Sequence, residues 1–187
     1  PEQEFILTNP VNNLDINPLH IDLAKLRQAD SLAQFFVLWL NIKNCLKYKL
    51  SPWDLFIKQY NLLRDQLDKY SEQISFVTNL TELDQAVADN KLVGFTCVEE
   101  GAFISRIEQL QDAYNLGVRY ITLVWNYETH IGVPSAIDQT RGLKPFGAEM
   151  VVEMQRLGIL VDVSHLSDRG VVEVLSLAKK PIIASHS

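Results

Sequence analysis

Two histidines of this chain stand at matching positions in a repeated local pattern. His165 follows the short apolar run 159–164, and His186 follows the apolar run 181–185. The stretch 168–179 between them has a helix-forming pattern. A strand–helix–strand unit places both strand ends on one rim of a parallel sheet, and imidazole nitrogen is a common metal ligand. The spacing therefore predicts two metal-ligating side chains on that rim.

A carboxylate fits the same geometry. The run 92–98 is typical of a buried strand, and Glu99 follows it directly. Glu99 would then reach the same rim as His165 and His186. One buried histidine alone is more often an ordinary core residue, but three N and O ligands from three strand ends favour a catalytic metal site. A structural zinc site would instead be rich in cysteine on short loops.

Composition limits the classes of protein to consider. The 187 residues are 47% hydrophobic and 21% charged, as in soluble globular proteins, and the formal net charge is −6. No basic stripe appears, so we expect no nucleic-acid partner. No apolar run is long enough to span a membrane, and the acidic start of the chain is unlike a signal peptide, so we expect a cytoplasmic protein. Cys45 and Cys97 are expected to be reduced core residues.

Strand and helix patterns alternate along the chain. After a loop over residues 1–18, the expected strands cover residues 34–40, 74–78, 92–98, 118–124, 159–164 and 181–185. The expected helices are a long one that begins at Pro52 behind a Ser51 cap, one over 81–90, and others over 104–116, 145–157 and 168–179. Such alternation over short connections predicts a parallel sheet covered by helices.

The sheet is expected to form a (β/α)8 TIM-type barrel. Ligands from several strand ends favour a barrel over an open doubly wound sheet, and the chain has no glycine-rich phosphate loop. Only about six strands are visible, so residues 1–187 are expected to be one catalytic barrel domain that is incomplete at both ends. No internal boundary is apparent.

Several ordered motifs resemble one family. The runs GVRYITL (117–123), GLKPFG (142–147), RLGILVDVSH (156–165) and SHS (185–187) are similar to the membrane (renal) dipeptidase family of zinc peptidases. The similarity extends over about residues 21–187, and WNYE (125–128) looks more like the bacterial branch.

The resemblance implies a barrel that binds two zinc ions and hydrolyses dipeptides, with a metal-bridged hydroxide as nucleophile. Glu99 matches the carboxylate that bridges the two ions, and His165 and His186 match two ligands of one ion. Trp125 and Tyr127 are candidates for the mouth of the substrate pocket, although they could equally be lids of the core. A dipeptide substrate and a second copy of the chain, in a homodimer, are the expected partners.

A His-x-Asp pair on the family's first strand, which would bind the other zinc ion, has no counterpart after a strand here. His20 and Asp22 have the spacing, but no strand precedes them, so we expect a capping or solvated role. A rival interpretation is a non-catalytic or truncated remnant with a partial metal site, and the 187-residue chain alone is expected to be inactive. Asp162 could support the ligands or be an ordinary buried carboxylate, and His130 is expected to be exposed.

Overall fold

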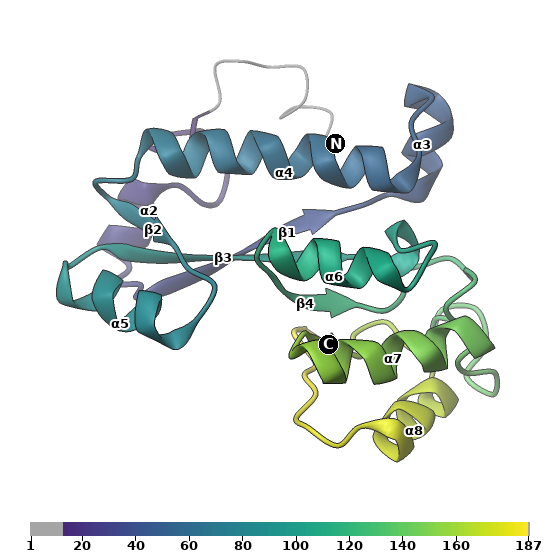
Figure 1. The fold of residues 1–187 in the computed structure, drawn as a ribbon. Coiled ribbons are helices and arrows are strands. Elements are labelled where there is room, and N and C mark those ends of the chain that lie inside the picture. The colour runs from purple at the N-terminus through teal and green to yellow at the C-terminus, as the bar shows by residue number, and fades with distance from the viewer. Residues whose placement is uncertain (1–12, 187) are drawn as a thin grey trace. The chain divides into compact units, whose positions relative to one another are not determined.

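The computed structural model describes residues 13–186 and shows strands and helices in alternation (Figure 1). The strands are β1 (Ala33–Trp39), β2 (Ile74–Phe76), β3 (Leu92–Glu99), β4 (Val118–Thr122) and β5 (Leu160–Asp162). The helices are α2 (Leu23–Gln28), α3 (Ile42–Tyr48), α4 (Pro52–Lys69), α5 (Leu80–Ala88), the 3-10 turn η1 (Gly101–Phe103), α6 (Glu108–Asn115), α7 (Pro145–Leu157) and α8 (Asp168–Leu177).

The five strands belong to one sheet in the order β1-β3-β4-β5, and β2 also pairs with β3. The pairs β2–β3, β3–β4 and β4–β5 are parallel. In the register, Glu99 lies opposite Thr122, and Thr122 lies opposite Asp162. The carboxyl ends of β3, β4 and β5 therefore meet at one edge of the sheet.

Backbone contacts divide the chain into two compact units. One unit comprises the chain up to Phe36 together with Lys58–Phe95, and the other comprises Val37–Ile57 and Thr96–Ser187. Two apolar clusters build the core of the first unit. The larger contains Leu23, Leu26, Leu67, Ile74 and Leu92, and the smaller contains Val77, Ala86 and Val93.

The second unit contains β4 and β5, the end of β3, and the helices that follow them. Its interior includes a ring cluster in which Phe56 and Phe103 are 4.7 Å apart between centroids and Trp53 stacks on Phe103 at 5.9 Å. Helices α6, α7 and α8 pack in sequence order, α6 on α7 and α7 on α8. This packing supports the strand ends that carry the candidate ligands.

Local signals account for the helix ends. Ser51 caps α4, because its Oγ accepts a hydrogen bond from the Asp54 amide at 3.1 Å. Pro145 begins α7, and Gly158 ends it in the left-handed conformation at φ 84°, where glycine has no Cβ to clash. Helices α4 and α7 begin at the predicted residues, and α7 also ends at the predicted residue.

Three predicted elements differ from the structure. The expected strand 181–185 is only a parallel bridge between Asp162 and Ile183. Two residues after Ile183, the Ser185 amide donates to the Asp162 side-chain carboxylate and not to a backbone carbonyl of β5, so the strand pairing ends there. The helix expected from residue 104 begins at Glu108, because the Gln109 side chain accepts the amides of Ser105 and Arg106.

The start of α5 and the whole of α3 also depart from the prediction. Helix α5 begins at Leu80 and not at the predicted Thr81. Its cap is Asn79, whose Oδ1 accepts the Glu82 amide at 2.9 Å. The sequence analysis missed α3, a helix of seven residues whose start is marked by Asn41, which accepts the Lys43 amide.

Candidate metal centre

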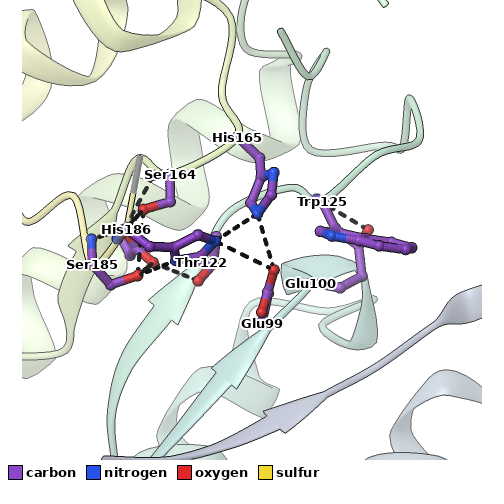
Figure 2. A network of polar contacts seen from close by, with 9 residues as sticks. Glu99, Glu100, Thr122, Trp125, Ser164, His165, Ser185 and His186 are labelled. Carbon is purple, nitrogen blue, oxygen red and sulfur yellow. Dashed lines mark hydrogen bonds and ion pairs between the residues drawn. The ribbon is translucent and has the colours of Figure 1, made fainter. Parts of the chain in front are cut away.

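Glu99, His165 and His186 converge at the carboxyl edge of the sheet. The Nε2 atoms of the two histidines are 2.7 Å apart. The Oε1 of Glu99 is 3.1 Å from Nε2 of His165 and 3.8 Å from Nε2 of His186. One ligand atom from each residue lies within 4.8 Å of the others, and Figure 2 shows all three side chains pointing toward one another.

Each of the three side chains is placed by a different backbone feature. Glu99 is the last residue of β3, and its carbonyl accepts the Leu40 amide at 3.0 Å. His165 lies in the turn after β5 with φ 67°, and its carbonyl accepts the Ser135 amide at 2.8 Å. His186 lies just beyond the bridge at Ile183. A strand end thus holds Glu99, a tight turn holds His165, and a segment anchored by one bridge holds His186.

The three side chains fit a zinc ion by the chemistry of their donor atoms. Two imidazole nitrogens and one carboxylate oxygen are the ligands of many catalytic zinc sites, with bonds of about 2.0–2.2 Å. Two ligand atoms on one tetrahedral ion are then about 3.3 Å apart. The separations of 2.7, 3.1 and 3.8 Å bracket this value. The side chains are 16% exposed for Glu99, 25% for His165 and 51% for His186, so solvent reaches the group.

A fully buried carboxylate, Asp162, contacts the residue that precedes the candidate ligand His186. Its oxygens accept five hydrogen bonds, from Thr122 Oγ1, Ser164 N, Ser164 Oγ, Ser185 N and Ser185 Oγ. Burial by itself would raise the pKa of Asp162, but the hydrogen bonds from Ser185, Thr122 and Ser164 outweigh it and lower the pKa. Asp162 is therefore a charged acceptor that fastens β4, β5 and the segment before His186 together.

Two serines connect Asp162 to His186. The Ser185 Oγ is 2.9 Å from Nδ1 of the His186 ring, and the Ser164 Oγ accepts the His186 amide at 3.1 Å. Figure 2 shows Ser164 and Ser185 on the same side of His186, away from Glu99. The sequence analysis considered Asp162 but missed both serines. The only signal was that each ligand histidine directly follows a serine.

Glu100 is a second buried carboxyl group beside the ligands. Its backbone has φ 89°, and its side chain accepts the amides of Ala102 at 3.0 Å and Trp125 at 3.4 Å. Loss of solvent raises the pKa of Glu100 to about 7, and the charge of Glu99 adds to the shift. Sequence reasoning gave Glu100 no role.

Trp125 and Tyr127 are both half-buried and form an aromatic group with Trp39. The Trp125 ring meets the Trp39 ring edge-on at 4.8 Å and the Tyr127 ring edge-on at 5.5 Å. Nζ of Lys43 lies 4.0 Å above the Tyr127 ring. In the view of Figure 2, Glu99 lies between His186 and Trp125. Rings of this kind can form the wall of a pocket for a small peptide.

The remaining polar candidates have other roles. Asp22 caps α2, accepting the Lys25 amide at 2.7 Å and pairing with the Lys25 ammonium group, as the capping interpretation predicts. His20 is exposed. His130 is exposed as predicted, although its Nε2 is 2.7 Å from the Ile104 carbonyl oxygen. Cys45 and Cys97 are buried, and neither is in a disulfide.

The parallel sheet, with three candidate metal ligands gathered at its carboxyl edge, defines the class: an α/β protein of the barrel type. Within that class the chain belongs to the membrane dipeptidase family, peptidase family M19, whose family model matches residues 3–187. The resemblance and the α/β fold class predicted from the sequence are thereby confirmed.

Individual relatives agree with this assignment. The chain is 32% identical over 181 residues to an uncharacterised dipeptidase of Schizosaccharomyces pombe. The aligned region covers 90% of this chain and 43% of that protein. The probable dipeptidase PvdM of Pseudomonas aeruginosa has a TM-score of 0.83 at 19% identity over 94% of this chain and 48% of its own. A Rhodobacter sphaeroides metallopeptidase, solved with a phosphinate mimic of L-Ala-D-Ala, has a TM-score of 0.82 at 20% identity over 99% of this chain and 62% of its own.

The chain thus spans less than half the length of its curated relative and about half to three-fifths of the two solved chains. Over residues 13–186, no helix is both long and apolar enough to cross a membrane.

Proposed function

We propose that the full-length protein is a zinc-dependent dipeptidase and that Glu99, His165 and His186 are metal ligands. The observation that carries the proposal is the convergence of one carboxylate oxygen and two imidazole nitrogens within 4.8 Å, in a chain of the membrane dipeptidase family. The three side chains would hold zinc through one carboxylate oxygen and two imidazole nitrogens, and the family resemblance implies a second ion near Glu99. The family match and the dipeptidase relative support an enzyme over a non-catalytic or truncated remnant that keeps the scaffold and a partial metal site.

The chain's own residues would have distinct roles. Bound zinc supplies a nucleophilic water at neutral pH and polarises the scissile carbonyl group. Glu99 acts as a ligand and not as the general base, because its carboxylate faces both imidazoles. Trp125 and Tyr127 would form one wall of the dipeptide site. Residues 1–187 would all belong to one catalytic barrel domain.

The test uses the full-length protein, stripped of metal with a chelator and then titrated with zinc. We expect two zinc ions per chain, and hydrolysis of L-Ala-L-Ala or L-Ala-D-Ala that appears only as zinc is restored. The variant His165→Ala should lose both bound metal and turnover. His130→Ala, which removes an imidazole outside the ligand group, should retain both. Turnover by the metal-stripped protein, or full zinc occupancy in His165→Ala, would contradict the proposal.

A further inference from the structure

We propose that Asp162, acting through the hydroxyl group of Ser185, holds the His186 imidazole in the tautomer with hydrogen on Nδ1, so that the Nε2 lone pair faces the metal centre. Asp162 and Ser185 are then positioning residues. The inference deepens the proposed function and rests on it for the metal, but the tautomer itself is a property of the metal-free protein.

The direction of the Ser185 hydroxyl hydrogen decides the tautomer of His186. Oγ of Ser185 is 2.6 Å from Oδ2 of Asp162, and an ionised carboxylate can only accept. A hydroxyl has one hydrogen, and Ser185 donates it to Asp162. At the 2.9 Å contact with Nδ1 of His186, Ser185 can therefore only accept, and Nδ1 must carry the hydrogen.

Neighbouring groups do not reverse this assignment. The Tyr120 hydroxyl also bonds Ser185, but Ser185 has only one hydrogen, which its 2.6 Å contact with Asp162 takes. The Ser164 hydroxyl donates to Oδ1 of Asp162 at 2.8 Å, so its 3.3 Å contact with Ser185 Oγ supplies no second hydrogen there. The Thr122 hydroxyl donates to Oδ2 at 2.6 Å, and the backbone amides of Ser164 and Ser185 donate to Oδ1. Every partner of Asp162 is thus a donor, as the ionised form requires.

The fixed tautomer matters for the ligand atom. A neutral imidazole has one N–H and one lone pair, and a metal needs the lone pair. Nε2 of His186 is the atom that faces His165 and Glu99, at 2.7 and 3.8 Å. Groups that hold the other nitrogen of a ligand histidine set its tautomer, and their loss typically weakens metal binding about 10- to 100-fold.

Substitution of Asp162 should reverse the hydrogen-bond direction. In Asp162→Asn the amide NH2 cannot replace Oδ1, because the two backbone amides that face Oδ1 cannot turn away. The NH2 must replace Oδ2, where it opposes the hydroxyls of Thr122 and Ser185. The Ser185 hydroxyl would then turn and donate to Nδ1, which moves the ring hydrogen to Nε2.

The experiment measures 15N chemical shifts of the His186 ring in metal-free, full-length protein at a pH where imidazoles are neutral, and then the zinc dissociation constant. We expect hydrogen on Nδ1 in the wild type and in Ser185→Thr, which keeps the hydroxyl. Ser185→Ala should lose the single tautomer, and Asp162→Asn should move the hydrogen to Nε2. Both should bind zinc about 10- to 100-fold more weakly.

Thr122→Val is the matched control, because it removes a hydrogen bond to the same Oδ2 without touching the Ser185 contact. It should keep the tautomer and bind zinc within about threefold of wild type. Hydrogen on Nε2 in the wild type, or an unchanged tautomer and zinc affinity in both Ser185→Ala and Asp162→Asn, would overturn the inference. A wild type with hydrogen on Nδ1 that binds no zinc would support the inference and contradict the proposed function instead.

Discussion

The amide of Trp125 donates a hydrogen bond to Oε2 of Glu100, 3.4 Å away, while Oε1 of Glu100 accepts the Ala102 amide at 3.0 Å. One buried side chain thereby ties the turn after β3 to the segment after β4, directly beside the candidate ligand Glu99 (Figure 2). No lysine or arginine among the described residues forms an ion pair with Glu100. Its carboxyl group is therefore costly to ionise.

We expect Glu100 to make the metal-free protein less stable as the pH rises. The raised pKa of about 7, against an ordinary 4.5, means that the folded state binds more protons than the unfolded state between these two values. The free energy of unfolding should fall across that window by about 3 kcal/mol at most, and this loss should be complete above pH 7. Below pH 4.5 the group contributes no pH dependence, because both states are protonated.

The measurement is urea unfolding of metal-free protein from pH 4 to 8, compared with Glu100→Gln. The variant cannot ionise at this position, so the wild-type loss of stability between pH 4.5 and 7 should shrink in it. Parallel pH curves for the two proteins would show that Glu100 titrates normally.

The substitution His186→Ala should lower turnover far more than stability. The side chain is about half exposed, so we expect the free energy of unfolding of the metal-free protein to change by less than about 1 kcal/mol. Bound zinc and dipeptide hydrolysis should fall together, the latter on the order of 100-fold or more. The control His20→Ala removes an exposed imidazole from a His-x-Asp sequence and should leave both unchanged. Loss of zinc in His20→Ala would contradict the capping interpretation of this segment.

Trp125→Ala should weaken substrate binding. The ring packs against Trp39 and Tyr127, so its loss removes one side of the proposed pocket wall. We expect KM for dipeptides to rise about tenfold, equivalent to about 1.4 kcal/mol, with a smaller change in kcat. Trp125→Phe keeps an aromatic face, so its KM should lie between the KM of the wild type and that of Trp125→Ala. A fall in kcat at constant KM would place Trp125 outside the substrate wall.

Thr96→Val should stabilise the protein. Thr96 is fully buried at the irregular step of the β3–β4 register, and its hydroxyl has no hydrogen-bond partner among residues 13–186. Valine has the same shape without the buried polar atom, so we expect a gain of about 1 kcal/mol in thermal or urea unfolding. Thr122→Val, which removes a hydroxyl that is bonded to Asp162, should instead lose about 1 kcal/mol. If Thr96→Val and Thr122→Val both lowered the free energy of unfolding, the assignment of an unpaired hydroxyl to Thr96 would be wrong.

Sequence patterns predicted the elements that are set by local signals. The apolar run ending at Glu99 and the helix between Pro145 and Gly158 needed only periodicity and helix-end residues. The bridge at Ile183 was predicted as a full strand, because nothing local shows that the Asp162 carboxylate takes the Ser185 amide. Roles that depend on contacts between distant segments were missed for the same reason.

The placement of the three candidate ligands followed from their positions after strand patterns. Their supporting hydrogen bonds did not, because serine and threonine have many possible partners until the fold brings one within reach. Glu100 was also missed, since a positive φ and full burial are unusual for glutamate and leave no sequence pattern.

The left-handed backbone of His165 has a consequence for engineering this protein. At φ 67°, a residue with a Cβ costs about 1 kcal/mol or more relative to glycine. A library selected for heat resistance alone would therefore enrich glycine at this turn and discard the imidazole. Any thermostable version should hold position 165 fixed and seek its gains elsewhere.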